Sequence, residues 1–136
     1  MNTNKKGDIG LVKTMADLVV KDYFVFTPIS DTTCVDLVVA NNSMFLKKVQ
    51  IKYWALVNGR MCISTSTVVN GKKVPVDLTK VDIWAVYCPD NDKIYYVPTK
   101  KLVGKKTMNL RVTELKQKIK NVNYASEYED ISKCWE

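Results

Sequence analysis

The order of apolar and polar residues along the chain predicts an N-terminal helix followed by short strands. Between residues 7 and 22, apolar side chains recur every three or four positions, which is typical of an amphipathic helix. Beyond the helix, β-branched and aromatic runs alternate with turn-forming residues, which indicates β structure. The expected apolar face of the helix comprises Ile9, Val12, Ala16 and Val19, widened by Leu11, Met15 and Leu18.

The turn signals predict how these strands connect. The sequence Asn41-Asn42-Ser43 separates two β-forming runs and predicts a hairpin, and Asn58-Gly59 predicts that a third antiparallel strand follows directly. The segment 70–75 is predicted to be a loop, and Pro98 is predicted to end the last strand. The predicted strands span residues 23–27, 34–40, 44–56, 60–69, 81–88 and 94–97. A helix packed on a mixed, mainly antiparallel sheet makes an α/β (α+β) layer fold.

Length and composition indicate one domain. The 136 residues, 46% of them hydrophobic, suffice for a single domain over residues 1–136. The four cysteines form no Cys-x-x-Cys pair and are expected to be reduced and buried. The first residues are polar, with no apolar run suited to export or to a membrane. We therefore expect an intracellular protein, cytoplasmic or nucleoid-associated, that is neither secreted nor membrane-bound.

The charge of the chain favours a polyanionic partner. Lys and Arg number 21 against 14 Asp and Glu, a net charge of +7. Neutralising phosphates releases counterions, so nucleic acid is the leading candidate partner. The basic residues concentrate in a C-terminal segment, residues 99–121, where Glu114 is the single acid. The candidates for contacts with DNA are Lys72, Lys73, Lys100, Lys101, Lys105, Lys106 and Arg111, with Arg60 or Arg111 as candidate base readers.

The chain contains no histidine, which limits the chemistry it can perform. A Ser-His-Asp triad, a Cys-His nucleophile pair, a histidine zinc site and an imidazole general base are all excluded. Any hydrolysis must use carboxylates, lysine, hydroxyls or a metal held by oxygen ligands.

Asp36 is the aspartate whose surroundings demand an explanation. It lies in an apolar run on a predicted strand, where an unpaired carboxylate would be costly. On the opposing arm of the hairpin, Gln50 and Lys52 are two residues apart and so share one face. The turn brings Asp36 roughly opposite residues 48–50, so the three side chains can converge. Two interpretations remain: a buried Asp36–Lys52 ion pair with Gln50 as a spacer, or a catalytic site.

A helix followed by a hairpin that carries Asp-x13-Gln-x-Lys resembles the site of PD-(D/E)XK nucleases. Most of the chain is similar to the endonuclease family of this superfamily that includes group I intron homing endonucleases. Val35 stands where the motif name has proline, and Asp8 stands where the family usually has glutamate. Gln50 stands where the superfamily usually has an acid, and this form is similar to that of the homing-type subgroup. The matching segments are Gly7-Asp8-Ile9-Gly10-x-x-Lys13 and residues 36–39, 49–52, 64–66, 82–89 and 124–128.

The resemblance implies a restriction-endonuclease-like core and a Mg²⁺-dependent, sequence-specific endonuclease that acts on double-stranded DNA. Asp36 would anchor the metal, with the Ile51 carbonyl and the side chains of Gln50 or Asp8 as further ligands. Lys52 would lie beside the attacking water. A helix cap is the alternative role of Asp8.

The resemblance also assigns the surroundings of the site. Ser64 and Ser66 would contact phosphates at its mouth, unless they belong to an ordinary exposed strand. One site cuts one strand, so a homodimer or tetramer is expected. The alternatives are a Holliday-junction resolvase of the same fold, a nucleic-acid-binding module without catalysis, and an RNA-binding protein.

Overall fold

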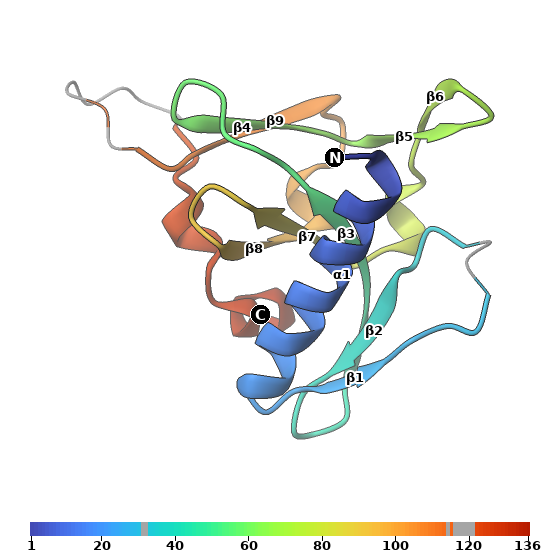
Figure 1. Cartoon of the computed structure of the whole chain (residues 1–136). Helices are drawn as coiled ribbons and strands as arrows, with labels where there is room; N and C mark the ends of the chain where they lie inside the picture. Colours follow the sequence, from blue (N-terminus) through green and yellow to red (C-terminus); the bar gives the residue numbers. More distant parts are fainter. Residues whose placement is uncertain (31–32, 114, 116–121) are drawn as a thin grey trace.

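The computed structural model describes residues 1–30, 33–113, 115 and 122–136 (Figure 1). In this part of the chain, helix α1 is followed by strands β1 to β9 and four short 3₁₀ helices, η1 to η4. Their bounds are α1 Thr3–Val20, β1 Phe24–Phe26, β2 Leu37–Ala40, β3 Leu46–Tyr53, β4 Arg60–Ser64, β5 Ser66–Val69, β6 Lys72–Pro75, η1 Leu78–Lys80, β7 Ile83–Cys88, β8 Lys93–Pro98, η2 Thr99–Lys101, β9 Thr107–Arg111, η3 Ala125–Tyr128 and η4 Ile131–Trp135.

The main sheet has five strands in the order β1-β2-β3-β7-β8, and α1 packs on one of its faces (Figure 1). The β3–β7 pair is parallel and the other pairs are antiparallel. Alternate residues of β7 build the two cores: Ile83 and Ala85 face α1, whereas Trp84 and Val86 face the pair β4–β9. The predicted α+β layer fold with a mixed, mainly antiparallel sheet is therefore confirmed.

The helix differs from its prediction in where it begins and which face it buries. It begins at Thr3, not at residue 7, because the Asn2 side chain accepts a hydrogen bond from the Lys5 amide at 2.8 Å and caps the first turn. Its buried residues are Gly10, Thr14 and Leu18. The predicted face was wrong for Val12, Ala16 and Val19, which are exposed, because small residues bring α1 close to β3. It was right for Leu18, which is buried, and for Leu11 and Met15, which pack against the same core.

The predicted β2–β3 hairpin is confirmed, including its register. Leu37 pairs with Val49, so Asp36 lies opposite Gln50, one position further along the ladder. The predicted strands 81–88 and 94–97 are present as β7 and β8, which pair as a second hairpin, and Pro98 is the last residue of β8. The two hairpins lie side by side because β3 and β7 pair in parallel.

The prediction of one long strand over residues 60–69 was wrong. The chain instead leaves the main sheet: β4 pairs with β9, and β5 pairs with β6 in a separate two-stranded ribbon. The cause is the core on the second face of the main sheet, where Met61 and Ile63 are fully buried. Thr65 is also buried at the break between β4 and β5. The predicted loop over residues 70–75 is the turn and second strand of this ribbon.

The remaining segments bear on the predictions in smaller ways. All four cysteines are free, but Cys62 is exposed and Cys34 is partly exposed, so the burial expected of them holds for Cys88 and Cys134. Trp135 stacks on Tyr23 with ring centroids 5.6 Å apart, which docks the C-terminal segment on the main sheet. No helix in the described ranges is long and apolar enough to cross a membrane. Glu114, Lys116, Lys118 and Lys120 of the predicted basic segment lie outside the described residues.

Candidate active site

Asp36 and Gln50 meet at the point where the β2–β3 ladder ends. The Asp36 amide donates to the Val49 carbonyl at 2.8 Å, which fixes Asp36 at the end of the ladder. The Ile51 amide donates to Asp36 Oδ2 at 2.7 Å and so fixes the carboxylate. The second oxygen, Oδ1, carries no such bond among the described contacts. Asp36 therefore presents an oriented carboxylate beside Gln50.

The Gln50 side chain supplies a buried oxygen without a partner. Gln50 is 7% exposed, and its Oε1 has no hydrogen-bond partner in the described structure. An unsatisfied buried acceptor is costly, of order 1–3 kcal/mol, and rare enough to need an explanation. Amide and carboxylate oxygens are the donors that hard divalent cations prefer. Asp36 and Gln50 therefore fit a cation such as Mg²⁺.

Lys52 lies on the same face of β3 but is not paired with Asp36. Its Nζ donates to the Ser66 carbonyl at 3.5 Å and lies 5.2 Å from the centroid of the Trp84 ring. The described ion pairs all involve other residues, so the Asp36–Lys52 ion pair of the first interpretation is not formed. The Lys52 ammonium is thus held by a carbonyl and an aromatic face, and it remains available to an anionic substrate.

Burial shifts the pKa of both charged groups toward neutrality. It raises the pKa of the Asp36 carboxyl, while the Ile51 amide and the charge of Lys52 lower it by less. It lowers the pKa of the Lys52 ammonium, which the charge of Asp36 raises by less. Desolvation thus outweighs the attraction between the two groups, so ionisation of either group destabilises the folded state. Shifts of this kind are concentrated at functional sites.

The break between β4 and β5 forms the wall opposite Lys52. Ser64 Oγ and Ser66 Oγ lie 2.7 Å apart and are partly buried. Between them, the Thr65 hydroxyl is within hydrogen-bond distance of the carbonyls of Lys105 and Lys106, at 3.0 and 3.2 Å. Thr65 therefore holds the segment with the Ser66 carbonyl, which accepts from Lys52, against the basic residues 105–106.

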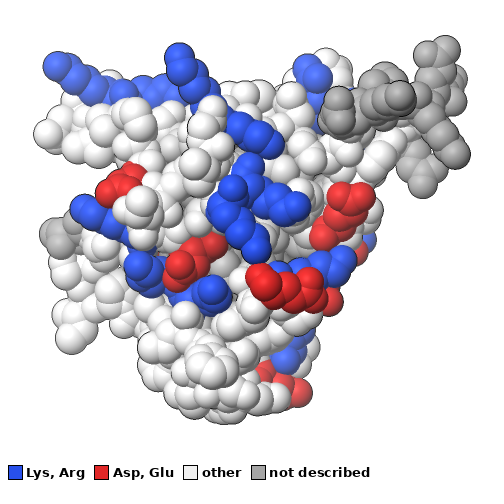
Figure 2. Space-filling view, turned by 180° about the vertical axis from the view of Figure 1, so that it is seen from behind, with Lys and Arg blue, Asp and Glu red and all other residues white. Residues whose placement is uncertain are grey.

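The predicted DNA-contacting residues fall into separate groups. Lys105 and Lys106 adjoin Thr65, and Lys72 and Lys73 lie on the exposed strand β6. In the rear view of Figure 2, the upper edge of the molecule carries basic side chains and no acidic ones, whereas basic and acidic side chains are mixed on the lower part of this face. Three candidates lie elsewhere or are engaged. Lys100 Nζ donates to the Glu136 carbonyl at 3.1 Å and lies beside Lys101, and Arg111 donates to the Thr113 carbonyl at 3.1 Å.

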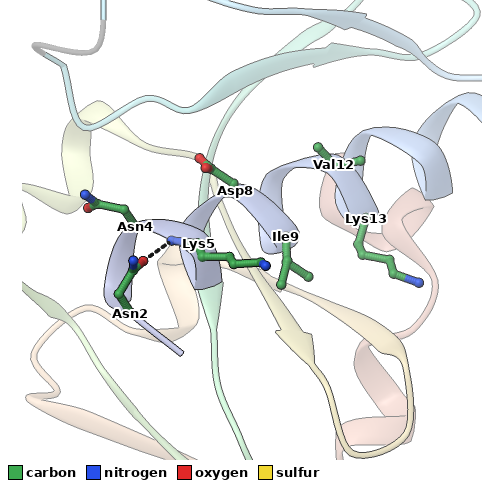
Figure 3. Close-up of a pocket in the computed structure, with 7 residues that line it drawn as sticks. All are labelled: Asn2, Asn4, Lys5, Asp8, Ile9, Val12 and Lys13. Carbon is green, nitrogen blue, oxygen red and sulfur yellow. Dashed lines mark hydrogen bonds between the residues drawn. The ribbon is translucent and has the colours of Figure 1, made fainter.

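The structure does not bring Asp8 into the cluster. Gly10 is the residue of α1 that packs on β3: a Cβ there would lie 3.4 Å from Ile51 Cγ2. Asp8, two positions earlier, is about 200° away around the helix axis. Its side chain is exposed in a hollow lined by residues of α1 and by the cap residue Asn2, where it projects from the same side as Val12 (Figure 3). Asn2 caps the helix, so the alternative role of Asp8 as the cap is wrong.

Trp84 is the site residue whose role the sequence did not indicate. It is fully buried, and its Nε1 has no partner in the described structure. It stands beside Gln50 in the parallel β3–β7 ladder and supports the Lys52 ammonium through its ring. A parallel pairing between distant strands leaves no local signal, so this contact could not be found from spacing.

Comparison with known proteins identifies the class. Residues 1–131 match the family model of the PD-(D/E)XK endonucleases, and the chain belongs to this family. No match was found among curated protein sequences. Among solved structures, the chain is similar to "a bacterial homing endonuclease: I-Ssp6803I", with a TM-score of 0.73 and 17% identity over 99% of this chain and 91% of the other. The restriction-endonuclease-like fold is thereby confirmed.

Proposed function

We propose that the protein is a sequence-specific endonuclease of the homing type that hydrolyses double-stranded DNA with a divalent cation, Mg²⁺ by preference. The observation that carries the proposal is the convergence of Asp36, the unpartnered Gln50 oxygen and the unpaired Lys52 ammonium on one sheet face. Membership of the PD-(D/E)XK endonuclease family supports it. The buried ion pair required by a purely structural interpretation is not formed.

The cation would be held by Asp36, by Gln50 Oε1 and by the carbonyl of Ile51. Within the described residues, no three Asp, Glu or Cys side chains gather in an arrangement that could hold a metal, so the amide and the carbonyl supplement a single carboxylate. Mg²⁺ retains several waters in such sites. When bound, the cation supplies Lewis-acid activation of a water and of the phosphate oxygens. We leave Asp8 out of the ligand set.

The side chains of the site orient the substrate and stabilise charge. The Asp36 carboxylate, fixed by the Ile51 amide, accepts a hydrogen bond from the attacking water and orients it. The Lys52 ammonium, directed by the Ser66 carbonyl and the Trp84 ring, donates to a non-bridging phosphate oxygen, where charge increases in the transition state. Ser64 and Ser66 share one hydrogen bond, and the hydroxyl that accepts in it can donate to the neighbouring phosphate. No step requires an imidazole.

Duplex DNA is the proposed substrate because basic side chains surround this site. Residues 60–76 and 102–113 contain six Lys and Arg and no Asp or Glu. Together they form the layer that includes β4, β9 and the β5–β6 ribbon. Contacts with phosphates would make binding strongly dependent on salt. A nuclease that acts on DNA in this way fits the intracellular location expected from the sequence.

A double-strand break at one locus requires a second copy of the site, so we propose a homodimer or a dimer of dimers. The apolar side chains Phe24 and Phe26 on the edge strand β1 are each 49% exposed, and Leu46 lies near them on the same sheet face. This face suits a second copy. Equilibrium sedimentation should show a dimer or tetramer, and Phe24→Asp with Phe26→Asp should give a monomer; a monomeric parent would contradict the assembly.

The experiment that tests the function is cleavage of DNA by the parent and matched variants. Supercoiled DNA and a library of linear duplexes, supplied with Mg²⁺, should be cut by the parent at defined sequences. Asp36→Asn and Lys52→Met should lower the rate at least 100-fold and leave binding intact, whereas Asp22→Asn, in an exposed turn, should cut like the parent. Cleavage confined to four-way junctions would replace this function with a resolvase. Binding without any cleavage would reduce the protein to a binding module.

A further inference from the structure

The β5–β6 ribbon projects from the body of the molecule and is not part of either core (Figure 1). Strand β6 is exposed throughout and β5 is exposed in its second half, and the two join through Asn70 and Gly71, which have positive φ values of 51° and 75°. These values define a tight turn suited to an antiparallel ribbon. An isolated two-stranded ribbon is only marginally stable in water, so this one is a candidate for stabilisation by a partner.

The composition of the ribbon indicates what that partner is. Three of its residues are exposed valines: Val68 is 69% exposed, Val69 51% and Val74 40%. Lys72 and Lys73 lie between them in the sequence, and no Asp or Glu occurs from residue 60 to residue 76. Methyl groups next to ammonium groups match an anionic surface that also carries apolar groups. The edges of DNA bases, with guanine acceptors and thymine methyls inside a phosphate frame, are such a surface.

The dimensions of the ribbon select one groove. Paired strands lie about 4.8 Å apart, so two strands with their side chains fit a major groove about 12 Å wide and do not fit the narrower minor groove. The base of the ribbon is at the candidate active site, since the Ser66 carbonyl accepts from Lys52 Nζ. From Ser66 to Val69 the strand advances about 10 Å, which equals roughly three base-pair steps.

The register assigns different contacts to the two lysines. Lys73 is opposite Val68, and Lys72 is opposite Val69, so the two lysines lie on opposite faces. On the Lys72 face, Val69 and Val74 are diagonal neighbours and partly cover each other. On the other face, Val68 is the most exposed side chain of the three valines and stands directly beside the Lys73 ammonium.

We propose that the β5–β6 ribbon enters the major groove of the DNA and reads bases within about four base pairs of the cleaved bond. Val68 contacts a thymine methyl, and Lys73 donates to the O6 and N7 acceptors of guanine. Lys72, on the other face, contacts a phosphate. This inference rests on the proposed function for its substrate, double-stranded DNA, and adds the element that gives sequence specificity.

The test separates base reading from catalysis by using variants that bind without cutting. In an Asp36→Asn background, sequences that bind are selected from a randomised duplex library, and base preferences are compared after Lys73→Ala, Val68→Ala and Lys72→Ala. Lys133→Ala and Val20→Ala, at exposed positions away from the ribbon, are the matched controls. Lys73→Ala and Val68→Ala should each reduce discrimination about tenfold at one to three adjacent base pairs only. Lys72→Ala should weaken binding to all sequences alike and lower the salt dependence of binding.

Base replacements in the preferred sequence test which groove the ribbon enters. Replacing guanine by 7-deazaguanine, which lacks the major-groove N7, should weaken parental binding at the position read by Lys73 and have no further effect on Lys73→Ala. Replacement by inosine, which lacks only the minor-groove amino group, should have little effect. An unchanged base profile in Lys73→Ala and Val68→Ala, in a protein that cuts DNA, would overturn the ribbon's role alone. Sequence-selective binding lost in these variants, in a protein that never cuts, would overturn only the nuclease.

Discussion

Neutralising Asp36 should make the protein more stable while it removes activity. The carboxylate is only partly exposed, and we take its desolvation as about 3 kcal/mol. Its compensation is the hydrogen bond from the Ile51 amide at 2.7 Å, whose charge assistance contributes about 1 kcal/mol. The unpaired Lys52 charge contributes about 1 kcal/mol more. Asn keeps the shape and can still accept from Ile51, so Asp36→Asn should raise the free energy of unfolding by about 1 kcal/mol at pH 7.

The expected change can be measured by thermal and urea unfolding. The entropy of unfolding of 136 residues is about 290 cal/mol/K, so 1 kcal/mol raises Tm by about 3.5 °C. Asp36→Ala supplies the contrast, because it leaves the Ile51 amide without an acceptor. It should be about 2 kcal/mol less stable than Asp36→Asn.

The pH dependence of stability tests independently whether the Asp36 charge stabilises or destabilises the folded state. Because the pKa of Asp36 is raised on folding, from an ordinary value of 3.8, ionisation destabilises the folded state. This destabilisation is absent at pH values below the ordinary pKa and reaches its full size at pH values above the raised pKa. The advantage of Asp36→Asn should therefore be present at pH 7 and disappear as the pH falls to about 4. A variant less stable than the parent at pH 7, or an advantage independent of pH, would refute this reasoning.

Further predictions concern the residues around the site. The pKa of Lys52 is lowered by burial, so the cleavage rate should fall as the pH rises through this lowered value. Trp84→Leu removes an aromatic face that favours the ammonium form and should move this alkaline limb to lower pH, whereas Trp84→Phe should move it less; identical profiles would exclude the contact. Thr65→Val loses the hydroxyl bonded to the Lys105 and Lys106 carbonyls and should lower the free energy of unfolding by about 1–2 kcal/mol in urea titrations. No loss is expected for Thr67→Val, a partly exposed position of the ribbon.

The sequence predicts most reliably the features that local contacts determine. The Asn41-Asn42-Ser43 turn sets the parity of the β2–β3 ladder, so it places Asp36 beside Gln50 and puts Gln50 and Lys52 on one face. Small buried residues limited the prediction of the helix face: hydropathy favours Val12 over Gly10, although only Gly10 permits the close approach to Ile51.

Features that depend on distant pairings could not be predicted in this way. The β3–β7 and β4–β9 pairs join segments far apart in the sequence, and no turn signal relates them. They nevertheless decide that Trp84 supports Lys52, and that the chain after Asn58-Gly59 leaves the main sheet. The resemblance of residues 7–13 to a family motif suggested Asp8 as a ligand, and the helical position of Gly10 shows why its side chain points elsewhere.

Cation binding tests the central claim most directly, because it examines the ligand set without requiring a known DNA target. Mn²⁺ serves as the probe, and its binding to the parent and to variants is measured by electron paramagnetic resonance in the presence of duplex DNA. Asp36→Asn and Gln50→Leu should each weaken Mn²⁺ binding at least tenfold, and Asp8→Asn should bind as the parent does. Binding that survives the loss of Asp36, or that disappears with Asp8, would contradict the proposed site.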